Sequence, residues 1–208
     1  MDLHFYGANC ISLGTKQARV IIDDNLADIG AKTVTKDNDI VIFTGAHASP
    51  ARSARIIIDQ PGEYEVGGVS VFGIAATAHI DEPGVQNATM YKIVADDLSV
   101  LVTGHIAPDL SDDQLETIGM IDVMFVPVGG NGYTLDPIGA LKLIKKVEPK
   151  LVIPTYYEDS SLSLPVPAQT LAQALQTLAM ESKETVNKLK IKSTDFGETT
   201  QLVVLERV

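Results

Sequence analysis

The chain has 208 residues, 45% of them apolar and 21% charged, as in an ordinary globular protein. Its 16 Lys and Arg against 27 Asp and Glu give a formal charge of −11, which disfavours a nucleic-acid partner because the surface repels phosphates. The single cysteine, Cys10, excludes an internal disulfide. The first twenty residues do not read as a signal peptide, and the most apolar window, 69–78, is too short to cross a membrane. We therefore expect one cytoplasmic domain, 1–208, without a membrane partner.

Short β-rich runs fill the first half of the chain, and Gly, Pro, Asn and Asp residues separate them as turn signals. Asp96 and Asp97, between two apolar runs, indicate the tip of a hairpin. The predicted strands are 4–13, 18–23, 39–43, 55–58, 69–75, 90–94 and 98–102.

Helices alternate with strands only in the second half. Ser111 and Gln114 form a capping box that opens a helix ending near 118, and Asp136 followed by Pro137 opens a second helix that ends near 147. Leucines at helical spacing predict a third helix over 168–182. The predicted strands here are 122–128, 151–154, 189–192 and 201–206. Many strands with few helices favour two sheets packed face to face, with helices outside.

The segment 39–50 reads Asp-Ile-Val-Ile-Phe-Thr-Gly-Ala-His-Ala-Ser-Pro and resembles the strand and loop that carry Thr-His-x-His-x-Asp-His in metallo-β-lactamase-fold hydrolases. Pro61-Gly-Glu-Tyr-Glu-Val66 is similar to a motif of one subgroup, the small predicted zinc-dependent hydrolases close to ascorbate-phosphate lactonases. Other segments of the chain also match the family, in the order that the family has: 5–10, 20–23, 101–105, 125–130, 133–136, 152–156 and 188–195. The resemblance covers nearly the whole chain. It implies an α+β fold, a four-layer αβ/βα sandwich with a site at one edge between the two sheets.

The resemblance also implies a pocket at the family's metal-ligand positions, where His and Asp side chains hold zinc and acidify a water. Most of these positions are replaced, so a two-metal centre is not expected. Two positions keep a family ligand, His47 and His79. The replaced positions are Gly45 for the first His, Ser49 for the motif Asp, Pro50 for the last motif His, His105 for the bridging Asp and Tyr156 for the final His.

Three histidines remain at positions where the resemblance makes ligands converge: His47, His79 and His105. Three imidazoles and a water can hold a single zinc ion, so one interpretation is a residual one-metal site. The other is that the histidines line a pocket without a metal, in which case the protein has no cofactor. We expect the three histidines to lie close together without tightly bound zinc, and Tyr156 to fill the vacated metal position.

Other residues have both a functional and a structural interpretation. Cys10 is a nucleophile or a small buried apolar side chain. Glu63 and Glu65 are an acid/base pair or solvated side chains. The glycines at 129–130 form a phosphate cradle or a tight turn.

Two functions follow. The first is a hydrolase-like protein that has lost two-metal hydrolysis and serves as a binding or structural module, with a small molecule as its partner. The alternative is an active single-zinc hydrolase of a lactone, ester or phosphoester. A homo-oligomer is expected from the resemblance to the lactonase group and from the apolar run 69–78.

Overall fold

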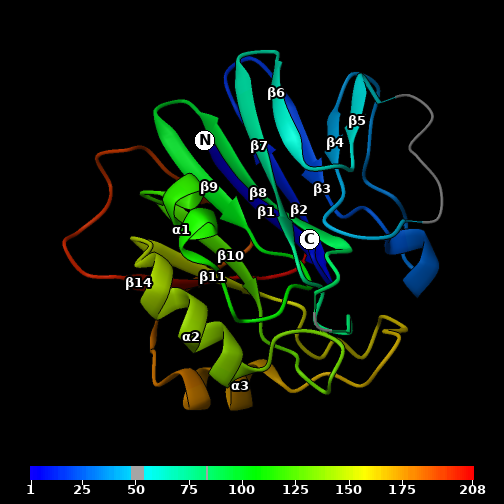
Figure 1. Cartoon of the computed structure of the whole chain (residues 1–208), viewed down its shortest axis with the longest axis vertical. Helices are drawn as coiled ribbons and strands as arrows, with labels where there is room; N and C mark the ends of the chain where they lie inside the picture. The colour runs from blue at the N-terminus through cyan, green and yellow to red at the C-terminus, as the bar shows by residue number, and fades with distance from the viewer. Residues whose placement is uncertain (48–53, 83) are drawn as a thin grey trace.

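The computed structural model in Figure 1 describes residues 1–47, 54–82 and 84–208. Two mixed β-sheets face each other, and the three α-helices lie together outside one of them. None of the helices in these described ranges has the length and apolarity that crossing a lipid bilayer requires.

The first sheet has six strands in the order β13-β1-β2-β3-β4-β5. Its strands are β1 (Asp2–Gly7), β2 (Cys10–Gly14), β3 (Arg19–Ile22), β4 (Ile40–Ile42), β5 (Ile56–Ile58) and β13 (Leu189–Lys190). The run 4–13, predicted as one strand, is a hairpin of β1 and β2 that reverses at Ala8, whose φ of 50° is left-handed. From β3 to β5 the pairing is parallel, so the carboxyl ends of these strands reach the same edge of the sheet.

The second sheet has eight strands in the order β12-β14-β11-β10-β9-β8-β7-β6. Its strands are β6 (Gly62–Val66), β7 (Val69–Ala76), β8 (Ala88–Ala95), β9 (Leu98–Val102), β10 (Val123–Pro127), β11 (Leu151–Thr155), β12 (Ser182–Val186) and β14 (Gln201–Leu205). Both edge strands, β6 and β12, were absent from the sequence-based prediction. The apolar run 69–78 forms β7, which pairs on both sides and is not an edge strand.

The predicted helix starts at 111 and 136 are confirmed. Ser111 and Gln114 form the capping box of α1 (Asp112–Ile118), and Asp136 caps α2 (Pro137–Val147). The third helix is shorter than predicted: α3 (Leu171–Leu178) begins after its N-cap Thr170 and ends before its C-cap Ala179, which adopts a left-handed conformation.

Apolar side chains form three layers of packing, consistent with the alternation of buried positions along the strands. One layer fills the space between the sheets and a second joins the eight-stranded sheet to α1, α2 and α3. The third covers the outer face of the six-stranded sheet, where the 3₁₀ helix η1 (Leu26–Ile29) and neighbouring loops pack. The predicted α+β sandwich is confirmed, with η1 and loops forming its outer layer on that side.

Candidate functional site

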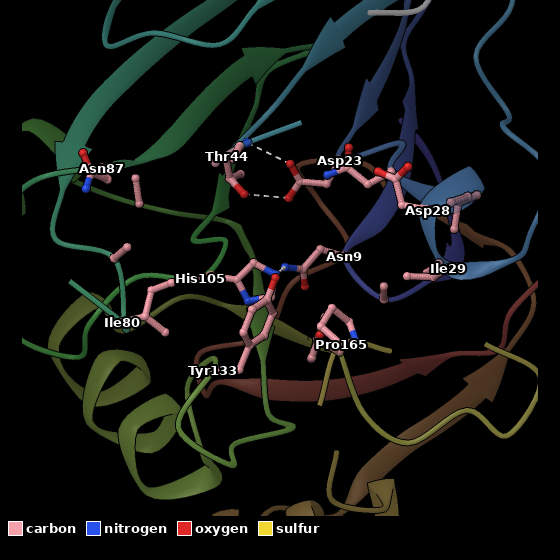
Figure 2. Close-up of a pocket in the computed structure, with 18 of the residues that line it drawn as sticks. Asn9, Asp23, Asp28, Ile29, Thr44, Ile80, Asn87, His105, Tyr133 and Pro165 are labelled. Atoms are coloured by element: carbon pink, nitrogen blue, oxygen red, sulfur yellow. Dashed lines mark hydrogen bonds between the residues drawn. The ribbon is translucent and has the colours of Figure 1, made fainter. Parts of the chain in front are cut away.

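A cavity of about 370 Å³ lies where the carboxyl ends of strands from both sheets meet. Asn9 follows β1, Asp23 follows β3, Thr44 follows β4 and His105 follows β9; Figure 2 shows all four at the cavity. Parallel strands bring loops together at their carboxyl ends, so residues far apart in the sequence share one site. The volume is in the range of small-molecule pockets.

Asp23 is the buried acid of the cavity. Its Oδ1 accepts from the Thr44 backbone N–H at 2.7 Å, and its Oδ2 accepts from the Thr44 hydroxyl at 2.6 Å (Figure 2). Burial raises the pKa of Asp23 from 3.8 to about 6, although the Thr44 hydrogen bonds oppose that shift. Thr44 in turn packs against Gly104, where an added Cβ would lie 2.3 Å from its hydroxyl oxygen. The segment therefore needs glycine at 104, which also has a φ of +61°.

His105 is held by a chain of side-chain hydrogen bonds. The Thr155 hydroxyl donates to Asn9 Oδ1 at 2.9 Å, which turns the Asn9 amide nitrogen toward His105 Nε2 at 3.1 Å. The Asn9 amide is the donor in this geometry, so Nε2 accepts and the proton of the neutral ring lies on Nδ1. Burial, with a smaller contribution from His79, lowers the pKa of His105 from 6.5 to about 4, so the ring is uncharged at neutral pH.

Tyr133 and Tyr156 pack around His105 to form an aromatic wall. The ring centroids of His105 lie 4.8 Å from Tyr133 and 4.7 Å from Tyr156, in edge-to-face arrangements. Tyr156 is 3% exposed, and among the described residues its buried hydroxyl has no hydrogen-bond partner. Burial raises the pKa of Tyr156 above its usual value, so the phenol stays protonated.

Comparisons with known proteins identify the family. The family model described as a beta-lactamase superfamily domain matches residues 2–156, more than half of the chain. The chain belongs to this superfamily. No curated protein sequence matches it.

Solved structures of the superfamily agree on the fold. A proposed zinc-dependent hydrolase from Thermotoga maritima is similar with a TM-score of 0.76 and 23% identity, over 99% of both chains. A proposed metal-dependent hydrolase from Parabacteroides distasonis has a TM-score of 0.66 and 14% identity, over 99% of this chain and 93% of the other. A metallo hydrolase from Ignicoccus hospitalis has a TM-score of 0.60 and 18% identity, over 86% and 90%. At these identities the likeness concerns the fold alone.

The superfamily's ligand positions differ in whether they line the cavity. Gly45, His105 and Tyr156 line the cavity, whereas His47 and His79 are not among its lining residues. The predicted positions Ser49 and Pro50 lie outside the described residues. Across residues 1–47, 54–82 and 84–208, no group of three or more His, Cys, Asp or Glu side chains is placed to hold a metal ion.

Local partners explain the directions of the two other histidines. The His47 ring stacks on Phe43 with a centroid distance of 4.0 Å, and its Nε2 lies 3.2 Å from Asp59 Oδ2. His79 donates its backbone N–H to the His105 carbonyl, and it lines a second hollow together with Asn131 and residues at the start of α2. His47 and His79 therefore have partners outside the cavity that His105 lines, and a site shared by the three histidines stays a prediction.

The same geometry decides whether the superfamily's zinc ions fit the described residues. Gly45 has no donor atom, and the Tyr156 phenol keeps its proton. The Nε2 lone pair of His105 already accepts from Asn9, and Nδ1 bears the ring proton. The described residues therefore do not fit the superfamily's zinc cage, which needs deprotonated carboxylates and free imidazole nitrogens.

The other candidates from the sequence do not reach the cavity. Cys10 is fully buried among apolar side chains, and burial raises its pKa well above the usual value, so it is not a reactive thiolate. Glu63 and Glu65 are exposed on β6. A Cβ at Gly129 would lie 2.1 Å from the Tyr156 carbonyl oxygen, so this glycine permits a close chain approach.

Sequence reasoning missed Asp23, Asn9, Thr44 and Tyr133 as site residues. Asp23 and Asn9 lie in segments that resemble the family, at the carboxyl end of β3 and just after β1. That position at a strand end was the usable signal. Tyr133 also begins a segment, 133–136, that resembles the family, but it follows a glycine-rich turn and not directly a strand end.

The described lining of the cavity is acidic. It includes Asp23, Asp28 and Asp81, and it contains no Lys or Arg. Asp81 has a structural role, because its carboxylate accepts from the backbone of Ala78 and from the backbone and side chain of Asn87. The two other carboxylates of the lining are Asp23, which accepts from Thr44 alone, and the exposed Asp28.

Proposed function

We propose that this member of the superfamily is a small-molecule binding module that has lost two-metal hydrolysis. The observation that carries the proposal is the set of residues at the family's ligand positions around the cavity: Gly45, His105 and Tyr156. The cavity is retained while its metal-binding groups are not.

The chemistry of these groups supports loss of hydrolysis. Zinc hydrolases of this kind need a metal-bound water with a lowered pKa and groups that hold the metal in place. A protonated phenol and an imidazole whose acceptor nitrogen is engaged supply neither. Without the metal, Asp23 is the one buried carboxylate in the described lining, and both its oxygens accept from Thr44.

The alternative is a single-zinc hydrolase. The observation in its favour is that His79 and His105 are neighbours through a backbone hydrogen bond and that the buried Nδ1 of each has no partner among the described residues. Binding of zinc would require both rings to reach one ion and would require His105 to lose its Nδ1 proton.

The test is elemental analysis of protein purified from cells grown with added zinc, manganese and iron, combined with assays on lactone, phosphodiester and β-lactam probes. We expect metal far below one equivalent and no metal-dependent turnover. Stoichiometric metal with turnover that is lost in His105→Ala and kept in the matched control His4→Ala would overturn the proposal. His4 lies on β1 and is not among the cavity's lining residues.

A further inference from the structure

The charges around the cavity are unbalanced. Asp23 is 7% exposed, and within the described ranges its carboxylate accepts hydrogen bonds from Thr44 alone and forms no ion pair. His47 lies near enough to act on the Asp23 charge, but its ring is paired with Asp59. A buried carboxylate without a cationic partner is unfavourable, and a positively charged group beside it relieves that penalty. Asp28 adds a second, exposed carboxylate to the same lining.

The opposite side of the cavity suits a cation as well. Figure 2 shows Asp23 and Thr44 on one side and Asn9, His105 and Tyr133 on the other. The electron-rich rings of tyrosines attract cations. His105 adds no positive charge because its ring is neutral. The buried Tyr156 hydroxyl, which has no partner among the described residues, can accept a hydrogen bond from an N–H donor.

We propose that the cavity binds a protonated organic amine, whose ammonium group lies between Asp23 and the aromatic wall and whose apolar part packs along that wall. This inference rests on the proposed function, because it names the ligand class of that same cavity. Carboxylates, phosphates and other anions would meet Asp23 and Asp28 without any Lys or Arg in the described lining. Uncharged ligands would fit the walls but would leave the Asp23 charge unpaired.

The test compares three probes with one ring and different charge: 2-phenylethylamine, 2-phenylethanol and phenylacetate. Each is titrated calorimetrically near neutral pH into full-length protein treated with a chelator, so that coordination of the amine to a metal plays no part. We expect the amine to bind about tenfold tighter than the alcohol, and phenylacetate to bind most weakly. Equal binding of amine and alcohol, preference for phenylacetate, or no amine binding at about 10 mM contradicts the inference.

Two variants locate the interaction. Asp23→Asn should reduce the affinity for the amine to that for the alcohol and leave the alcohol unchanged. Tyr156→Phe removes only the hydroxyl and should weaken the amine by about threefold. Asp37→Asn is the matched control, because Asp37 is exposed before β4, while Thr44 and the cavity lie after that strand. Amine affinity unchanged in Asp23→Asn, or reduced equally in the control, would contradict the assignment.

The outcomes separate this inference from the proposed function. Lack of amine preference in a protein without metal or turnover removes the ligand class and leaves the binding module in place. Stoichiometric metal with turnover removes the proposed function, whatever the amine does.

Discussion

Asp23 and His105 face one cavity with opposite responses to pH. The folded-state pKa of Asp23 is raised to about 6, so the folded chain holds a proton that the unfolded chain has released above 3.8. That contribution to the free energy of unfolding falls as pH rises from 3.8 to 6. The pKa of His105 is lowered to about 4, so its contribution rises as pH increases from 4 to 6.5.

We predict that these two contributions nearly cancel in the unchanged protein, since each is about 3 kcal/mol. Asp23→Asn should leave the His105 contribution, so that stability rises between pH 4 and 6.5, the span between the folded and ordinary pKa of His105. His105→Gln should leave the Asp23 contribution, with stability falling as pH rises. Urea denaturation across this range measures both. Parallel pH profiles for the two variants would show that the assigned shifts are wrong.

Gly104 supports the Asp23–Thr44 pair by making room for Thr44. Gly104→Ala should reduce the free energy of unfolding by about 2 to 3 kcal/mol, because the new Cβ meets the Thr44 hydroxyl and the backbone is left-handed. The control is Gly132→Ala, at a φ of +73° with open space around it, which should lose about 1 kcal/mol. Equal losses in chemical denaturation would mean that the contact with Thr44 contributes nothing.

At the scale of elements, capping residues predicted helix starts well. Asp136 accepts from the Gly139 backbone N–H at 2.7 Å, as its position before Pro137 indicated. Edge strands were harder to predict: β6, which begins at the glycine of a Pro-Gly pair, alternates exposed glutamates with half-buried residues, and the first four residues of β12 are polar. Val186, the last residue of β12, is its one apolar side chain. The strand character of β6 and β12 comes from pairing with β7 and β14, which the local sequence does not encode.

The Asp136 cap gives a prediction at this scale. Asp136→Ala should lower the free energy of unfolding by about 1 kcal/mol because the first turn of α2 loses its acceptor. Asp136→Asn keeps a side-chain oxygen and should lose much less. Thermal or urea unfolding measures both variants, and an alanine variant as stable as the asparagine variant would contradict the capping role.

For the whole molecule, the family resemblance predicted a pocket at the edge between the sheets, and Gly45, His105 and Tyr156 line the cavity found there. The surroundings of His47 and His79 could not be predicted from the sequence. His47 stacks on Phe43 and lies beside Asp59, and His79 lies near the start of α2. These are contacts within loops or between segments distant in the sequence. A ligand position recognised in the sequence gives the location of the backbone, whereas the direction of the side chain depends on the residues that surround it.

A homo-oligomer remains a prediction at the molecular scale. The apolar run 69–78 no longer supports it, since β7 is paired on both sides, and the resemblance to the lactonase group is the remaining reason. Light scattering should give at least twice the chain mass of 22.3 kDa. A constant mass of one chain at all concentrations would contradict it.

The central claim is that the cavity at the edge of the two sheets binds no zinc. In this account His105 is neutral, and its Nε2 accepts a hydrogen bond from Asn9. Long-range ¹H–¹⁵N spectra of the histidine rings, recorded with and without added zinc, test this most directly. The account predicts that His105 near neutral pH carries its proton on Nδ1 and that one equivalent of zinc leaves its resonances unchanged. A His105 ring that loses this proton and shifts on adding one equivalent of zinc would contradict the account.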